Sequence, residues 1–389
     1  MEFLKAIEKF KDKKFLIPKP LIVVIEDVGW WNGRDGSQKN QPFRSGIKRN
    51  HDLNDYNALV LFAKSLGIQI IWGFVWCDWD RNNILKKLPC STWMGKNWHV
   101  PVKDFSMLNK AAEIINSNKN HIEIAFHGLG HEFWENGILS RTEFHDFECN
   151  MRSSDEIENH FKAAREIIKT SGIHIRFPEI FIPPALKHSF GNGEKGFQKL
   201  LKNAGFKIVI TLFEKARKYK PPIFEKFTKE CTITIIERGV SPVQWNCIGA
   251  EPDFSFDWPL LSLHWTNLLH QNSEMNFKIV EKWAAFLREG SKKNGLILLP
   301  DIKNSIAQLI YSELADISET EKGIIIDLEK ADALLSEYFD DTSQKMIHIF
   351  VENNDDLSLN LKGAKAVLVS KNGMYSIVPN EKNIEFVFN

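Results

Sequence analysis

The sequence predicts an α/β protein built around parallel strands. Residues 21–25 are apolar and rich in β-branched side chains, as in a strand that is buried on both faces. Residues 122–126 alternate between apolar and other side chains and also predict a strand. A strand that is buried on both faces favours a parallel sheet.

Two histidines, His127 and His131, directly follow the strand predicted at residues 122–126. At this spacing both imidazoles fall on one side of a single turn, and the two glycines between them allow the backbone to turn tightly. Such a pair can hold one divalent ion, although two unrelated side chains are the alternative. A catalytic zinc-like ion takes three protein ligands and keeps an open position. We expect the third ligand to be Asp27, which follows the strand at residues 21–25.

Five segments occur in an order that is typical of one family. They are Ile25-Glu26-Asp27, the histidine pair with its approach at residues 123–131, Phe181-Ile182-Pro183-Pro184, residues 205–210, and Leu260-Leu261-Ser262-Leu263-His264. With these segments the chain resembles the NodB-homology polysaccharide deacetylases, which are metal-dependent carbohydrate N- and O-deacetylases. The resemblance runs from residue 21 to about residue 310 and implies a distorted (β/α) barrel.

The resemblance also implies a role for each polar side chain. Asp27, His127 and His131 would be the metal ligands, Glu26 the base and His264 the acid. The bound ion would polarise the acyl carbonyl and lower the pKa of a bound water molecule. The base would take the proton of that water, and the acid would protonate the departing amine. Zinc is the expected metal, with cobalt, manganese and nickel as alternatives.

The sequence departs from the family at two positions. Glu26 stands where the family usually has Asp, and adjacent residues on a strand point to opposite faces, so its longer side chain must reach round or another base must act. Ile182 stands where the family places an arginine that orients the base. Arg34 and Arg176 are the candidate substitutes. The interval between Asp27 and His127 is longer than is usual in the family, which implies inserted loops.

These insertions are rich in tryptophan. Seven of the chain's twelve tryptophans lie between the first predicted strand and the histidine pair, namely Trp30, Trp31, Trp72, Trp76, Trp79, Trp93 and Trp98. Indole rings stack on the apolar faces of sugars, and strand-end loops form the active face of a barrel. We therefore expect a substrate-binding group made of Trp30, Trp31, Trp76, Asp78, Pro183 and Pro184. Core packing or a dimer contact is the alternative for the tryptophans, and a solvated loop position is the alternative for Asp78.

Composition limits the partners and the location. The 389 residues include 50 Lys plus Arg and 50 Asp plus Glu, so there is no electrostatic case for nucleic acid or for an anionic membrane. Five cysteines without a C-x-x-C pair fit reduced thiols. The first residues lack the apolar stretch of a secretory signal, and no segment reaches transmembrane length. We expect a cytoplasmic protein, with homo-oligomerisation left open.

The pattern changes near residue 315. Residues 1–315 are expected to form the barrel, and the charged residues 318–323 are expected to be a linker. Short apolar runs at residues 346–351, 366–370 and 384–388 predict a small β-rich domain at residues 316–389. We expect this domain to act as a lid, an oligomer contact or a weak carbohydrate-binding module.

Together these features predict a hydrolase that removes an acetyl or other N-acyl group from a carbohydrate. The bond it cleaves would be a linear amide that is not a peptide bond. A cytoplasmic saccharide, a sugar nucleotide or a lipid-linked precursor fits the expected location. Three alternatives stay open: an amidase or deformylase for another small N-acyl compound, an inactive saccharide-binding protein on the same barrel, and a glycosidase. The glycosidase needs two carboxylates that flank a glycosidic bond, for which Asp78 and Asp80 are the only tempting pair.

Overall fold

The computed structural model describes residues 15–33, 45–102, 104–320, 323–335, 338, 345–351, 359–369 and 373–388. They form two compact units. The larger is Val23–Phe286, and the smaller consists of the described residues before Val23 and after Phe286. The structure thus draws the boundary earlier than residue 315, and it assigns the beginning of the described chain to the smaller unit.

The larger unit is built on a curled, half-barrel sheet of eight strands. In spatial order these are β11 (Phe227–Glu230), β12 (Ile233–Glu237), β9 (Ile208–Thr211), β7 (Ile180–Phe181), β4 (Ile122–Phe126), β3 (Ile70–Phe74), β2 (Ile22–Val28) and β13 (Leu260–His264). Each pair of neighbours from β2 to β12 is parallel, whereas β11 is antiparallel to β12. The α/β prediction is confirmed. Because β11 and β13 remain as edges, the curl does not close into a full barrel.

The central strands have apolar sequences because both of their faces are covered. All seven residues of β2 are buried, as are all five of β3 and all four of β9. Such strands read as unbroken apolar runs, because helices cover one face and the inside of the curl covers the other. Within β2, Glu26 and Asp27 are buried but are not apolar. Two buried acids in an apolar strand require charged or hydrogen-bonding partners nearby.

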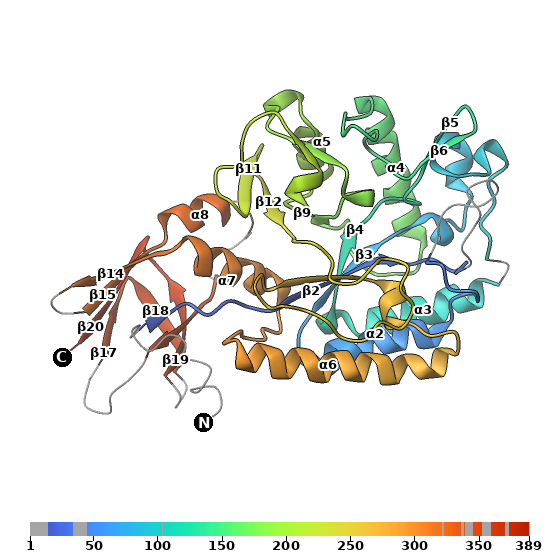
Figure 1. Cartoon of the computed structure of the whole chain (residues 1–389). Helices are drawn as coiled ribbons and strands as arrows, with labels where there is room; N and C mark the ends of the chain where they lie inside the picture. Colours follow the sequence, from blue (N-terminus) through green and yellow to red (C-terminus); the bar gives the residue numbers. More distant parts are fainter. Residues whose placement is uncertain are drawn as a thin grey trace. The chain divides into compact units, whose positions relative to one another are not determined.

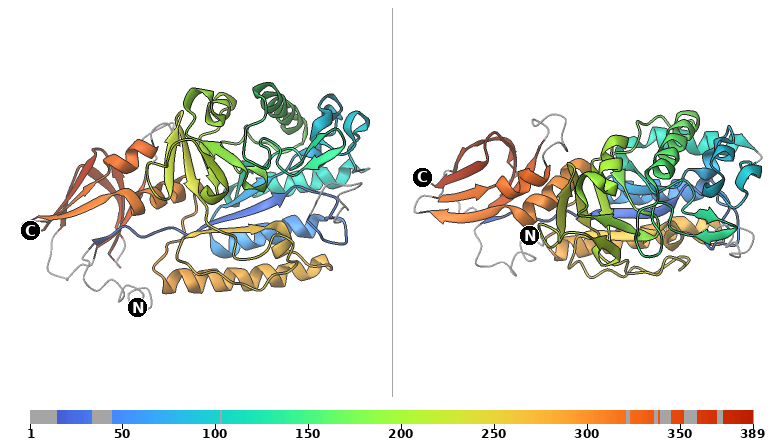
Figure 2. Two further views of the ribbon diagram at one scale, coloured as in Figure 1. Left: turned by 45° about the horizontal axis from the view of Figure 1, so that its top comes forward. Right: turned by 90° about the horizontal axis from the view of Figure 1, so that it is seen from above.

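Four helices connect parallel strands, namely α2 (Leu53–Leu66), α3 (Phe105–Ser117), α4 (Ser154–Thr170) and α5 (Phe197–Ala204). A further helix, α6 (Asn276–Lys293), follows β13. Capping boxes begin α2 and α4, with Asp52 and Ser153 as the respective N-cap residues, so part of the unpaired backbone N–H groups is satisfied. Figure 1 shows β2, β3 and β4 in the middle of this unit, with α2 and α3 below them and α5 above. The left view of Figure 2 shows α6 on the same side of β2 as α2.

Two short strand pairs lie outside the main sheet. The hairpin of β5 (Phe133–Glu135) and β6 (Ile138–Ser140) follows the histidine pair, and β8 (His188–Phe190) pairs in parallel with β10 (Ala216–Lys218). No helix among the described residues has the length and apolar character needed to cross a membrane.

The smaller unit contains two four-stranded sheets. One has the order β1 (Phe15–Leu16), β16 (Ile347–Val351), β19 (Met374–Pro379) and β18 (Ala364–Val369). The other has the order β14 (Asp316–Thr320), β15 (Gly323–Asp327), β20 (Asn383–Phe388) and β17 (Leu359–Lys362). Helices α7 (Ile302–Leu314) and α8 (Glu329–Leu335) belong to the same unit.

The three apolar runs expected as strands correspond to β16, β18 and β20. The prediction of a linker at residues 318–323 is wrong for its described residues, because Ser318–Thr320 belong to β14 and pair with β15, which begins at Gly323. Residues 321 and 322 lie outside the described residues. Ser318 and Thr320 are exposed, which fits their polar side chains. The placement of β1 beside β16 was not visible in the sequence, because this pairing joins residues from opposite ends of the chain.

Candidate active site

The candidate site lies where the parallel strands end. Asp27 is the penultimate residue of β2, and His127 directly follows β4. Arg238 directly follows β12, and His264 is the last residue of β13. Since the carboxyl ends of parallel strands meet at one edge of a sheet, residues far apart in the chain converge there.

A bulge in β2 explains how the side chains of Glu26 and Asp27 can both lie at this edge of the sheet. The pairing of β2 with β3 shifts between Ile25 and Val28, so these two acids stand opposite the single residue Gly73. Asp27 adopts a left-handed conformation with a φ of 66°. A bulge of this kind re-aims side chains, and Asp tolerates the left-handed region better than most residues. Strict alternation therefore does not separate the two carboxylates.

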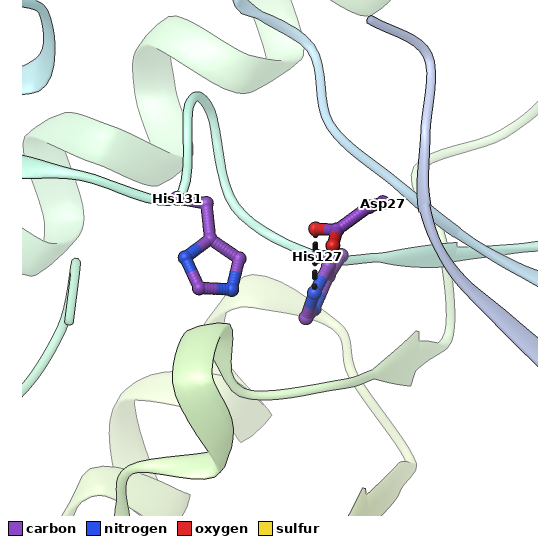
Figure 3. A group of neighbouring side chains, drawn as sticks. All are labelled: Asp27, His127 and His131. Atoms are coloured by element: carbon purple, nitrogen blue, oxygen red, sulfur yellow. Dashed lines mark ion pairs between the residues drawn. The ribbon is translucent and has the colours of Figure 1, made fainter. Parts of the chain in front are cut away.

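Asp27, His127 and His131 form a buried group that has the composition of a metal site. One ligand atom from each lies within 4.8 Å of the others. His127 Nε2 is 3.6 Å from Asp27 Oδ1, and the two imidazole rings are 5.0 Å apart between centroids. Figure 3 shows the Asp27 carboxylate facing His127, with the ring of His131 on the other side of the group.

Backbone groups fix the orientation of both imidazoles. His127 Nδ1 lies 2.9 Å from the carbonyl oxygen of Ile182, to which it donates, so Nε2 is the nitrogen left to accept or to bind an ion. The backbone N–H of Ala185 donates to His131 Nε2 at 2.9 Å. Ala185 follows Pro183 and Pro184 in the turn after β7, so the two prolines help to position this donor. Both prolines are buried.

The residues present fit a divalent ion. Among the described residues, no hydrogen bond reaches Asp27 Oδ1 or His127 Nε2, although both atoms are buried. Buried polar atoms without partners are costly, and an ion held by one carboxylate and two imidazoles would satisfy them. This donor set is one that zinc accepts in catalytic sites with an open position.

Electrostatic coupling within the group is strong. Burial acts to raise the pKa of Asp27, but contact with His127 and the charges of the surrounding histidines hold it well below its usual range. Burial acts to lower the pKa of His127, yet contact with Asp27 and the charge of Glu26 raise it overall. For His131, burial and the charge of Arg141 lower the pKa to about 3. The Asp27 carboxylate and a neutral His131 are the forms that bind metal.

A buried arginine, which the sequence argument missed, holds Glu26. Arg238 Nη1 lies 3.1 Å from Glu26 Oε1, and both side chains are almost completely buried. The other carboxylate oxygen, Glu26 Oε2, lies 3.9 Å from His127 Nε2 and 3.8 Å from His264 Nε2. Glu26 therefore stands between the candidate metal group and His264. The signal that could have found Arg238 is its position two residues after the β-branched run Ile233–Ile236.

Two other arginines were expected as the substitute at this position. Arg176 is exposed, and Arg34 lies outside the described residues. Ile182, which stands in place of the family's arginine, packs near Gly73, where an added Cβ would come within 3.3 Å of its Cδ1. The cation beside Glu26 thus comes from a different strand end.

An open cavity of about 450 Å³ borders this group. Its walls include Glu26, Asp27, His131, Arg238 and His264, together with Arg141, Lys215, Ser241, Gln244 and Trp245. The guanidinium of Arg141 lies 5.4 Å from the centre of the Trp245 ring, a cation–π arrangement that holds the indole at the cavity wall. Burial lowers the pKa of His264, although the charges of Glu26 and Asp27 oppose this effect.

The other expected substrate-binding residues are not among those that line this cavity. Trp30, Trp31 and Trp76 are 1%, 5% and 0% exposed, and the Trp31 ring packs 5.5 Å from that of Tyr56. Asp78 is also buried, and its carboxylate accepts the backbone N–H of Trp31 at 2.9 Å. These side chains hold the loops that follow β2 and β3. Trp245 is the indole that borders the cavity.

A second buried carboxylate supports the turn between the histidines. Both oxygens of Glu143 accept the backbone N–H of Leu129, at 3.0 and 2.9 Å. Gly128 has a φ of +89°, and an added Cβ would collide with Glu143 Oε2. The glycine is therefore required both by the backbone conformation and by the approach of Glu143.

Comparisons with known proteins give distant likenesses only. No family model matches the chain, and no curated protein matches its sequence. Among solved structures, a candidate polysaccharide deacetylase from Mycobacterium smegmatis has 17% identity and a TM-score of 0.30, over 64% of this chain and 63% of the other. This chain therefore spans less than two thirds of that protein. A family 4 carbohydrate esterase from Streptomyces lividans, in complex with acetate, has 9% identity and a TM-score of 0.32, over 72% and 94%. A protein described as T48 deacetylase, with substrate, has 11% identity and a TM-score of 0.29, over 75% and 91%. We therefore argue the function from the geometry of the site.

Proposed function

We propose that the chain is a metal-dependent hydrolase that removes an acetyl or other N-acyl group from a carbohydrate. The observation that carries this proposal is the buried group of Asp27, His127 and His131 beside an open cavity, with Glu26 and His264 at the same cavity. One acid and one base that flank a metal group are the set that hydrolysis of an amide requires.

Asp27, His127 and His131 would hold the ion. When bound, it would supply a Lewis acid for the acyl carbonyl and would lower the pKa of a water molecule. The Nδ1–H of His127 is bound to the Ile182 carbonyl, so this ring is kept in the tautomer that offers Nε2 to an ion.

Glu26 is the proposed base. Its Oε1 is held by Arg238 at 3.1 Å, which leaves Oε2 on the side of His127 and His264. A carboxylate fixed in this way can take the proton of the attacking water without first losing rotational freedom. Arg238 is a positioning residue in this scheme, because it acts through Glu26.

His264 is the proposed acid. Its Nε2 lies 3.8 Å from Glu26 Oε2, and its side chain is 15% exposed, so it reaches the cavity while remaining tied to the base. The backbone N–H of His264 donates to Asn267 Oδ1 at 2.8 Å, which fixes the end of β13. A proton given by His264 to the amine nitrogen would complete the cleavage of the C–N bond.

The cavity supports a sugar as the substrate. A volume of about 450 Å³ is within the range of small-molecule sites. Trp245 offers an aromatic face for a sugar ring, while Ser241 and Gln244 line the same cavity and offer hydrogen-bonding groups for hydroxyls. These features support a carbohydrate, rather than another small N-acyl compound, as the substrate.

The test is acetate release from a panel of N-acetylated mono- and oligosaccharides, after the chain has been loaded with zinc or cobalt. We expect acetate release that a chelator abolishes and that added metal restores. Acetate release from simple N-acyl amines but not from sugars would contradict a carbohydrate substrate and favour another small N-acyl compound. Saccharide binding by the metal-loaded chain without any acyl release would contradict the enzyme and favour a binding protein.

A further inference from the structure

A second cluster contains a nucleophile and adjoins the turn between the two histidines of the proposed hydrolase site, because Glu143 belongs to both. Cys90 Sγ lies 3.6 Å from His160 Nε2, and His160 Nδ1 lies 2.8 Å from Glu143 Oε1. The thiol, the imidazole and the carboxylate therefore follow one another as nucleophile, base and orienting group. His160 is 1% exposed and belongs to α4, whereas Cys90 is partly exposed and lies in the short 3-10 helix Pro89–Ser91.

Cys90 lines a cavity of its own. An open space of about 550 Å³ is lined by Cys90 together with Trp93, Phe133, Trp134 and Met94. The charged side chains on its wall, Glu135 and Glu156, are acidic. His160, which is buried, does not line this space. The nucleophile thus stands at the surface of the cavity, and its base stands behind it.

Arg152 and His160 bring positive charge near Cys90. The guanidinium carbon of Arg152 lies 3.4 Å from the centre of the Phe133 ring, its Nε donates to the backbone carbonyl of Glu143 at 3.0 Å, and its charge acts on Cys90. Burial acts to lower the pKa of His160, but the bonds to Cys90 and Glu143 raise it to about 9. Reactive cysteines occur in partly exposed, electropositive surroundings of this kind, whereas structural cysteines are buried in apolar ones.

A comparable series of hydrogen-bonded side chains elsewhere in the molecule lacks an accessible nucleophile. Ser45 Oγ lies 3.0 Å from His51 Nε2, and His51 Nδ1 lies 2.9 Å from Asp55 Oδ2. Ser45 is only 1% exposed, and Asp55 is also paired with Arg49. That chain of bonds stabilises the beginning of α2. The Cys90 chain differs because its nucleophile opens on a cavity.

We propose that Cys90, His160 and Glu143 form a second reactive centre, at which Cys90 accepts an acyl group from an uncharged ester or thioester. The sulfur attacks the carbonyl carbon, an S–C bond forms, and the bond to the leaving oxygen or sulfur breaks. The proton lost by the thiol is held at His160 Nε2 and passes to the leaving group, so the products are S-acyl Cys90 and an alcohol or thiol. Glu143 keeps the imidazole oriented for both transfers.

The cavity indicates the kind of acyl donor. Its aromatic and thioether lining suits an apolar acyl or aryl group, while Glu135 and Glu156 disfavour an anionic donor. A proton-shuttling imidazole with an orienting carboxylate is what acyl transfer requires, because the leaving group must be protonated. Simple alkylation of the thiol would not need it.

The test is a competition between two cysteines of the same folded chain. Cys231 is partly exposed like Cys90, and its Sγ lies 3.8 Å from Glu194 rather than beside an imidazole. The chain is exposed briefly to para-nitrophenyl acetate at neutral pH, and S-acetylation is mapped by peptide mass spectrometry. We expect Cys90 to be acetylated at least about tenfold faster than Cys231. His160 stands beside Cys90 to take the thiol proton, whereas burial and the charge of Glu194 raise the pKa of the Cys231 thiol. Equal rates, or a slower Cys90, would overturn the proposal.

Two variants test whether His160 and Cys90 cause the faster acetylation. His160→Gln should reduce the acetylation rate of Cys90 to that of Cys231, while Cys231 itself reacts as before; an unchanged Cys90 rate would exclude His160 as the base. Cys90→Ser should lose the adduct and retain metal content and acetate release from N-acetylated sugars. Loss of both activities in Cys90→Ser would contradict a separate centre. The comparison within the wild-type chain decides the question even if His160→Gln does not fold.

Discussion

Arg238 Nη1 lies 3.1 Å from Glu26 Oε1 at the edge of the sheet where the parallel strands end. The two residues come from β2 and from the position after β12, which are not neighbours in the sheet. Because both are buried, the pair is costly to break. The pair therefore links the curl of the sheet to the chemistry of the site.

Arg238→Lys should lower kcat by about tenfold to a hundredfold, because an ammonium on a different stem does not keep the contact of 3.1 Å between the guanidinium and Glu26 Oε1. Metal content should stay unchanged, since Arg238 contacts the base and not the candidate ligands. Steady-state kinetics and elemental analysis of the same preparation check both statements. Arg176→Lys is the matched control, because Arg176 is exposed, and it should behave as the wild type.

His264→Gln should retain the metal and lose turnover by about a hundredfold or more, the usual contribution of a general acid. The residue lies 3.8 Å from Glu26 and is not part of the candidate ligand group. Metal content and kcat are measured together, with the exposed residue His99 changed to Gln as the control. Loss of metal in His264→Gln would mean that this histidine is a ligand rather than an acid.

Trp245→Ala should raise KM for the sugar by about tenfold and leave the free energy of unfolding nearly unchanged, because Trp245 is a partly exposed wall of the cavity. Trp76→Ala should instead cost about 3–5 kcal/mol of stability, because Trp76 is 0% exposed and its ring packs 4.5 Å from Phe74. Urea unfolding and initial-rate kinetics separate the two effects. A Trp76→Ala chain of normal stability with a raised KM would return Trp76 to the substrate site.

Asp55 should make the chain sensitive to acid. Burial acts to raise its pKa, but the bonds to His51 and Arg49 lower it from 3.8 to about 2. A lowered folded-state pKa gives stability that is present above the unfolded value and is lost as the pH falls from about 4 towards 2, at most about 2 kcal/mol. Urea unfolding at pH 7 and at pH 3 measures this loss. Asp55→Asn should be less stable at pH 7 and should show a smaller difference between the two pH values.

The sequence predicted the parts of the site that depend on local order. Asp27, His127, His131 and His264 follow predicted strands, and the structure brings all four to one edge of the sheet. The α/β class followed from the same strands, because buried parallel strands have an apolar pattern that can be read directly.

The remaining features depend on contacts between distant segments. The pairing of Arg238 with Glu26 requires the curl of the sheet, and the bulge at Asp27 removes the alternation that argued against Glu26. Burial of Trp31 requires the loops after β2 and β3 to pack together, which composition alone does not show. The pairing of β1 with β16 is likewise decided by tertiary structure.

The most direct test of the proposed function is the metal content of the purified chain after loading with zinc and removal of free ion, compared with that of His127→Ala. His127 Nε2 is buried within 4.8 Å of the other ligand atoms, so its loss should remove the grip on the ion. We predict about one zinc per wild-type chain and almost none in His127→Ala, with both proteins folded by circular dichroism. A His127→Ala chain that holds as much zinc as the wild type, or a wild-type chain that holds none, would contradict the metal site and the hydrolase built on it.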